Sequence, residues 1–221
     1  MLVAIVASHI DSLHRWELFL QMINTVSTQS ESLDAFYIGI SFPSKDMQQI
    51  YESRLDTVRD LLRGVCSRLT ITQTKAPCSQ GKMWQRMVRR YPALSDPNTW
   101  ILFSDDDDLW HKDRVAMYLH GLQKVRQYPP SQRMLVSNIR SNVYATSNRE
   151  TREVKVEDVD VLLESGELHL GSQGNYWDLC IRGTIFCEFI NIANDFILQD
   201  PMFDVLLRHH ICTYDLSLIH I

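Results

Sequence analysis

The sequence predicts one α/β domain in which a mostly parallel central sheet is flanked by helices. Short apolar runs of strand length alternate with longer segments of helical periodicity, which is the pattern of βαβ units. The chain has 221 residues, of which 45% are hydrophobic and 22% charged. A chain of this length and composition can bury the core of one large domain.

The strands are predicted from apolar runs that end at polar or turn-forming residues. The first of them, residues 2–7, is continuously apolar and stops at Ser8. Continuous runs of this length are typical of parallel strands that are buried on both faces. The predicted strands are residues 2–7, 35–41, 69–72, 100–103 and 134–139.

The helices are predicted from apolar residues at helical spacing and from the residues that bound them. Asp11 is a candidate N-cap for the first helix, Gly64 is placed to end the second, and Pro92 closes the third. The predicted helices are residues 11–26, 44–63, 81–91 and 113–128, the last stopped by Pro129 and Pro130.

The pattern is looser after about residue 142. Residues 183–192 fit a strand or a helix, and residues 201–210 fit a helix with Pro201 in its first turn. The other assignments are a strand at 153–156, a short helix at 158–164 and a glycine-containing loop at 168–177. We expect this second half to elaborate the substrate side of a single domain, residues 1–221.

Composition excludes several classes of function. A net charge of -5 argues against a protein whose main function is to bind the phosphate backbone of nucleic acids, so nucleic acid is not the expected partner. Charged residues interrupt every apolar stretch before the length of a membrane span. The apolar start lacks the basic region and cleavage site of a signal peptide, and the five cysteines have no paired spacing. We therefore expect free thiols in a reducing, cytoplasmic compartment.

The strongest chemical signal is the run of four aspartates at residues 105–108, directly after the fourth predicted strand. In an open parallel sheet, ligands bind beyond the carboxyl ends of the strands. Unit charges about 4 Å apart repel by roughly 1 kcal/mol in water and about 4 kcal/mol at an effective dielectric near 20. A bound Mg²⁺ or Mn²⁺ would relieve that repulsion. The alternatives are a solvated acidic loop, or Asp108 as the N-cap of the next helix.

Residues 101–114, ILFSDDDDLWHKDR, resemble the DxD signature of GT-A glycosyltransferases, in particular the family 2-like group. The resemblance implies a GT-A-like fold in which residues 1–140 bind a nucleotide sugar and residues 141–221 serve the acceptor. It implies that Asp105 contacts the ribose or uridine side of the donor and that Asp105 and Asp107 hold the metal. Asp106, between them, is grouped with the donor-binding residues, and Asp108 is an extra acid.

Other donor-side residues follow from the same resemblance. Ser8 and His9 stand at the end of the first strand, where the family receives the nucleotide, and Ser41 stands where a base-contacting acid often follows the second strand. Gln80, Gly81 and Lys82 resemble the segment before the nucleotide-side helix, with Lys82 offsetting diphosphate charge. The alternative for this segment is an ordinary helix start with a solvated lysine.

The acceptor side is less defined. Residues 200–208 are similar to the family's base-bearing segment, so Asp200 is the first candidate for the general base, followed by Asp204 and Asp178. Each of these could instead be a helix cap or a surface acid. The remaining candidates are His209, as a late metal ligand or a helix-dipole partner, and Tyr176 and Trp177, as acceptor-binding or core aromatics.

The whole chain is also similar to glycosyltransferases of large algal (chlorella) viruses, which can be multidomain and would act in the host cytoplasm. The resulting hypothesis is a metal-dependent enzyme that transfers a hexosyl or deoxyhexosyl group from a UDP-sugar to a carbohydrate or glycoprotein glycan, with inversion and an aspartate base.

Two other functions stay open. One is a noncatalytic module that binds sugar nucleotides or carbohydrates. The other is a Mg²⁺-dependent phosphatase of the haloacid dehalogenase type, whose signature requires Thr or Val where this chain has Leu109 or Trp110.

Overall fold

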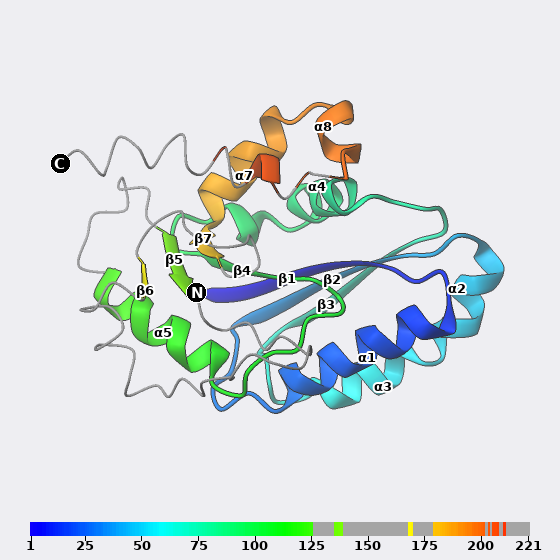
Figure 1. Cartoon of the computed structure of the whole chain (residues 1–221), viewed down its shortest axis with the longest axis horizontal. Coiled ribbons are helices and arrows are strands. Elements are labelled where there is room, and N and C mark those ends of the chain that lie inside the picture. Colours follow the sequence, from blue (N-terminus) through cyan, green and yellow to red (C-terminus); the bar gives the residue numbers. More distant parts are fainter. Residues whose placement is uncertain are drawn as a thin grey trace, which may run out of the picture.

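The described residues form one seven-stranded sheet, with the strand order β3-β2-β1-β4-β7-β5-β6 (Figure 1). The computed structural model describes residues 1–125, 135–138, 168–169, 179–201, 203, 205–207 and 210. The strands are β1 (Leu2–His9), β2 (Ala35–Ser41), β3 (Leu69–Thr74), β4 (Trp100–Ser104), β5 (Leu135–Asn138), β6 (Leu168–His169) and β7 (Leu179–Arg182).

The sheet has a parallel part and an antiparallel part. β1 pairs in parallel with both β2 and β4, and β2 pairs in parallel with β3. β7 then runs antiparallel between β4 and β5, and β6 is antiparallel to β5. The predicted α/β fold with parallel central strands is therefore confirmed, and β7 brings a segment from late in the chain beside β4.

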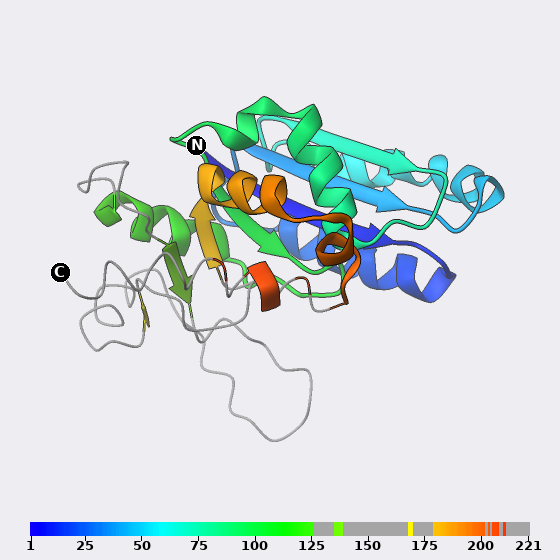
Figure 2. The ribbon, with the colours of Figure 1, turned by 90° about the horizontal axis from the view of Figure 1, so that it is seen from above.

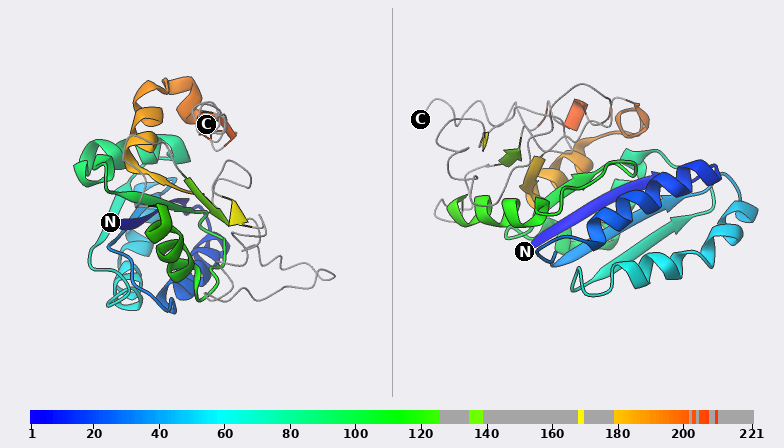
Figure 3. Two further views of the ribbon diagram at one scale, coloured as in Figure 1. Left: turned by 90° about the vertical axis from the view of Figure 1, so that its left-hand side faces the viewer. Right: turned by 60° about the horizontal axis from the view of Figure 1, so that its bottom comes forward.

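Helices cover both faces of the sheet. In Figures 1 and 2, α1, α3 and α5 lie on one face and α4, α7 and α8 on the other. Figure 3 shows α1 and α3 side by side across their face. The helical elements are α1 (Leu13–Ser27), α2 (Lys45–Glu52), α3 (Leu55–Leu61), α4 (Gln80–Arg90), the 3-10 helix η1 (Pro92–Ser95), α5 (Arg114–Val125), α7 (Gly183–Ile192) and α8 (Asp195–Gln199).

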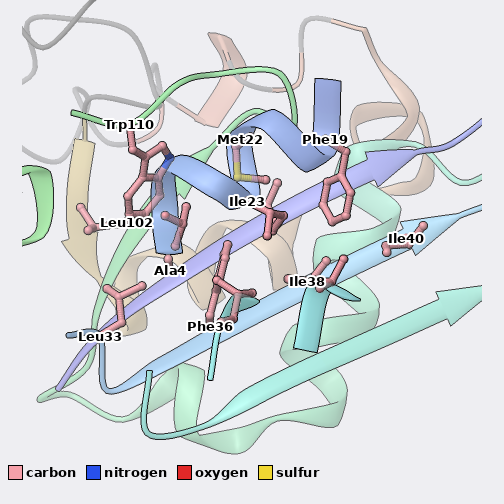
Figure 4. Close-up of a cluster of buried hydrophobic side chains, with 14 of the residues drawn as sticks. Ala4, Phe19, Met22, Ile23, Leu33, Phe36, Ile38, Ile40, Leu102 and Trp110 are labelled. Atoms are coloured by element: carbon pink, nitrogen blue, oxygen red, sulfur yellow. The ribbon is translucent and has the colours of Figure 1, made fainter. Parts of the chain in front are cut away.

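Two hydrophobic cores follow from this layering. Leu2, Ala4 and Val6 of β1 point into the core beneath α1, whereas Val3 and Ile5 point into the core beneath α4 and α7. Since successive side chains of a strand point to opposite faces, a strand covered on both faces must be apolar at every position. Figure 4 shows the first core, where α1 packs on β1 and β2.

Several predicted boundaries need correction. The N-cap of α1 is Ser12, whose hydroxyl accepts a hydrogen bond from the Arg15 amide at 3.2 Å, and not Asp11. The helix predicted at 44–63 is two helices, α2 and α3, separated by a turn at Ser53 and Arg54. In this turn the Arg54 amide donates a hydrogen bond to the Tyr51 carbonyl at 3.0 Å. The apolar pattern continues across this break, so periodicity could not reveal it.

In the second half, the ambiguous segment 183–192 is a helix, α7. Part of the loop predicted at 168–177 is strand β6, and Phe203, residues 205–207 and His210 are helical as expected. The assignments at 153–156 and 158–164 lie outside the described residues.

The cysteine and membrane expectations can be compared with the described part of the chain. Cys66, Cys78, Cys180 and Cys187 are free thiols there. No helix in that part combines the length and apolar character needed to cross a membrane.

Gly183 allows a close approach between the start of α7 and the backbone of η1. A Cβ built at this position would lie 1.9 Å from the Leu94 carbonyl oxygen, whereas a Cβ at Gly39 would meet only Met side chains. We expect Gly183→Ala to lower the free energy of unfolding by about 3 kcal/mol, because backbone must move to relieve the clash. Gly39→Ala should cost less, since flexible side chains can shift. Urea denaturation of both variants measures this, and equal costs would contradict it.

Candidate functional site

A cavity of about 800 Å³ opens at the carboxyl ends of β1 and β4. Its walls come from the ends of these two strands, from α1, from the start of α4 and from the end of α8. The lining residues are Ala7, Ser8, His9, Arg15, Pro77, Cys78, Ser79, Gln80, Lys82, Arg86, Asp105, Asp106 and Gln199. This is the edge of the sheet where the sequence predicted a ligand site.

The acidic turn after β4 is anchored through Asp106. This carboxylate is only 3% exposed, accepts a hydrogen bond from the Ser8 hydroxyl and forms an ion pair with Arg15. The Arg15 Nε also donates to it at 3.1 Å, and Arg15 Nη1 reaches Asp107 Oδ2 at 2.9 Å. The end of β1, the first turns of α1 and the turn after β4 therefore meet at one carboxylate.

Asp105 lies on the wall of the cavity and is largely shielded from solvent. Gln80 of α4 donates to its Oδ1 at 3.3 Å. Burial, followed by the charges of Asp108, Asp107 and Asp106, raises the pKa of Asp105 to about 7. The group therefore changes charge near neutral pH, and a nearby cation would hold it ionised.

Asp108, the last of the four aspartates, is partly buried near Arg114. Its Oδ2 is buried and has no hydrogen-bond partner among the described residues. Burial raises the pKa of this carboxyl, and the Arg114 charge opposes that shift. Because α5 begins only at Arg114, Asp108 is not its N-cap. Burial of Asp106 likewise excludes a simple solvated loop.

Trp110 and Arg114 support the turn from the other side. The Trp110 indole Nε1 donates to the Ser104 hydroxyl at 2.8 Å, and the Arg114 guanidinium lies 4.3 Å from the centre of the Trp110 ring. Arg114 Nη2 also donates to the Phe103 carbonyl at 2.9 Å. The end of β4 is thereby fixed by buried side chains of the segment that follows the aspartates.

His9 and Ser41 lie together at the ends of β1 and β2. Their Nδ1 and Oγ atoms are 2.8 Å apart, and the Ser41 hydroxyl is 3.3 Å from the Cys78 carbonyl oxygen. Ser41 is fully buried, so His9 and Cys78 form the cavity wall at this point. The structure thus brings the predicted Ser8, His9 and Ser41 to one end of the cavity.

The start of α4 is fixed against α8. The Ser79 hydroxyl caps α4 and donates to the Leu198 carbonyl at 2.7 Å, and Lys82 forms an ion pair with Asp195. A Cβ at Gly81 would lie 2.7 Å from that same carbonyl, so the close approach that this glycine permits is to α8. Lys82 and the exposed Arg86 still line the cavity.

The acceptor-side candidates are only partly described. Asp200 follows the last residue of α8 and is partly exposed; its neighbour Gln199 lines the cavity, whereas Asp200 does not. The candidates that lie outside the described residues are Asp178, Asp204, His209, Tyr176 and Trp177.

Arg15 is the ion-pairing partner of the acidic turn, and the sequence analysis did not identify it. It lies on the polar side of α1, where a charged residue ordinarily faces solvent. Its partners are 91 and 92 residues away in sequence. The sequence feature that could have pointed to Arg15 is the run of four acids after a buried strand, because such a run needs a nearby positive charge.

Among the residues that the structure describes, no three His, Cys, Asp or Glu side chains are grouped so as to hold a metal ion.

Comparison with solved structures agrees with a GT-A-like α/β fold. The chain is similar to S. aureus TarS, with a TM-score of 0.57, 13% identity and coverage of 96% of this chain and 33% of that one. It is also similar to TarS residues 1–349 in complex with UDP, with a TM-score of 0.56, 12% identity and coverage of 96% and 54%. Identity this low shows similarity of fold alone.

The chain spans between about a third and about half of the length of these TarS chains. Neither known protein families nor curated protein sequences match it.

The raised pKa of Asp105 should make the stability of the protein depend on pH. Because its pKa is raised to about 7 in the folded protein, the folded state holds this proton to a higher pH than the unfolded chain does. The contribution of Asp105 to stability should therefore fall as pH rises from about 4 to about 7. In chelator, we expect Asp105→Asn to be about 2 kcal/mol more stable than the parent at pH 8, with the gain vanishing near pH 4.

Denaturant melts at both pH values measure this difference. Asp60→Asn, which removes an exposed carboxylate of α3, is the matched control and should show no such gain. A stability advantage of Asp105→Asn that does not depend on pH would contradict the assignment.

Proposed function

We propose that the chain is a nucleotide-sugar-dependent glycosyltransferase. The observation that carries the proposal is that two carboxylates of the acidic turn and three basic side chains line one cavity at the carboxyl edge of a GT-A-like sheet. Basic groups there can bind a diphosphate, and the carboxylates can bind a cation that bridges to it. A cavity of about 800 Å³ is also in the usual range for small-molecule sites.

The proposed donor is a UDP-sugar. TarS residues 1–349, which share the fold, are described in complex with UDP. In this chain the base would lie near His9 and Cys78, with Ser8, Ser41, Gln80 and Gly81 shaping that end of the cavity. Asp105 would contact the ribose, with Asp106 holding the turn in place. Lys82 would contact the diphosphate, and residues 1–140 would form the donor half.

The acidic turn fits a hard divalent cation, Mn²⁺ or Mg²⁺. Two of the four adjacent carboxylates pair with the Arg15 guanidinium, one Asp108 oxygen is buried without a partner among the described residues, and the pKa of Asp105 is raised to about 7. Asp105 and Asp107 would hold the ion, with His209 as a further ligand. The ion would offset negative charge on the departing diphosphate.

On the acceptor side, residues 141–221 would bind a carbohydrate or a glycoprotein glycan, with Tyr176 and Trp177 contacting its rings. Asp200 would take the proton of the attacking hydroxyl, with Asp204 and Asp178 as the other candidates. Attack opposite the diphosphate would invert the anomeric carbon. The partial coverage of TarS is compatible with further domains in a longer polypeptide.

A noncatalytic sugar-nucleotide-binding module is the second candidate. The observation that favours it is that Asp200 does not line the cavity. A binding module would bind the donor and show no turnover with any acceptor.

The first test is calorimetric titration of the chain with UDP, other nucleoside diphosphates and UDP-sugars, in Mn²⁺ and then in chelator. We expect micromolar, Mn²⁺-dependent binding of UDP compounds, and Asp107→Ala should weaken it at least about tenfold by removing a metal ligand. Asp60→Ala, at an exposed acid on α3, should bind as the parent does. A folded chain that binds no nucleotide rules out the proposed function.

The second test concerns the base. Asp200→Asn should keep UDP-sugar binding and lower transfer about 10² to 10⁴-fold, because a positioned base contributes about that factor. Release of UDP in the presence of a panel of glycan acceptors measures transfer. Unchanged transfer would assign the role to Asp204 or Asp178, which the corresponding Asn variants identify.

A further inference from the structure

Arg15 binds two carboxylates of the acidic turn that differ sharply in environment. Asp106 is 3% exposed and is also bonded by Ser8, whereas Asp107 is 42% exposed and meets Arg15 through Nη1 alone, at 2.9 Å. The Nε and Nη2 atoms of Arg15 donate hydrogen bonds to Asp106, and Nη1 donates to Asp107. The contact to Asp106 is therefore the anchored one, and the contact to Asp107 is exposed and easily exchanged.

The exchangeable contact lies at the residue proposed to hold the metal. A cation that binds Asp107 competes with Arg15 Nη1, because both are positive charges attracted to the same carboxylate and they repel each other there. The displaced nitrogen stays close to the cavity, because Arg15 itself lines the cavity and Nε and Nη2 remain on Asp106.

We propose that Arg15 is a positioning residue that exchanges Asp107 for the donor diphosphate when the cation binds. Without ligands it neutralises the acidic turn and competes with the cation. With both ligands present, its Nη1 donates to a diphosphate oxygen. Arg15 thereby makes binding of the cation and the nucleotide mutually dependent. This inference rests on the proposed function: the competition uses its metal site at Asp107, and the exchange uses its diphosphate donor.

The test measures each half separately in Arg15→Gln. The first measurement is binding of Mn²⁺ alone, followed by the electron paramagnetic resonance signal of the free ion. We expect Mn²⁺ to bind about tenfold more tightly than in the parent, because the guanidinium of Arg15 no longer competes for Asp107. The second is UDP binding at saturating Mn²⁺, which should weaken about tenfold because a diphosphate contact is lost.

Two further variants control the result. Arg59→Gln removes an exposed arginine of α3 that also pairs with an aspartate, and it should change neither affinity. Arg15→Lys keeps a charge beside Asp106 but cannot bridge two carboxylates, so it should tighten Mn²⁺ binding while leaving the turn neutralised. If Arg15→Gln does not fold, as shown by thermal melting, Arg15→Lys carries the test.

The outcomes separate this inference from the proposed function. Mn²⁺ binding that is equal or weaker in both Arg15 variants overturns the competition, even when the parent binds UDP. Weakening of both Mn²⁺ and UDP binding would also overturn it, because that pattern describes a residue that only holds the turn together. A parent that binds no UDP overturns the diphosphate half together with the proposed function, whereas tighter Mn²⁺ binding in the variants would still support the competition.

Discussion

The candidate site depends on the burial of one carboxylate, Asp106, between Ser8 and Arg15. Taking a carboxylate out of water is costly unless hydrogen bonds and an opposite charge replace the lost hydration. Here a hydroxyl from the end of β1 and a guanidinium from α1 supply both. These contacts fix the turn after β4 relative to β1, and that turn presents Asp105 to the cavity and Asp107 to solvent.

The layered fold provides the rigid frame for this arrangement. β1 lies between β2 and β4, with a hydrophobic core on each face, so the end of β1 at Ser8 and the end of β4 before Asp105 are held in place by the sheet and by both cores. On the other face, Ser79 and Gly81 bring α4 against the Leu198 carbonyl of α8. Donor-side and late-chain elements therefore share one wall of the cavity.

Much of this could be predicted from the sequence, and the reasons differ by element. The strands at residues 2–7 and 35–41 were predictable because burial on both faces demands continuous apolar residues. The position of the aspartates was predictable because they follow such a strand. The break at Ser53 was not, since the apolar spacing continues through it. The conformation of residues 183–192 was ambiguous because a short apolar segment suits either period.

The pairing of Arg15 was not predictable, because a charged residue on the polar side of an amphipathic helix ordinarily faces water. Nothing local distinguishes it from Arg59 of α3 or from Arg63 just after α3, which each pair with an acid three residues earlier in the sequence. Contacts between segments far apart in sequence become visible only when the sheet order brings their elements together.

The position of β1 in the sheet also has a consequence for the order of events during synthesis. β1 is translated well before one of its two neighbours, β4, which begins at Trp100, and the acid that Ser8 and Arg15 bind comes later still. Pairings of such long sequence separation form slowly, and unpaired apolar strands can aggregate meanwhile. After β1 has left the ribosome, the nascent chain must therefore keep this apolar strand without one of its partners while about ninety further residues are made. Protection by chaperones matters most during that interval.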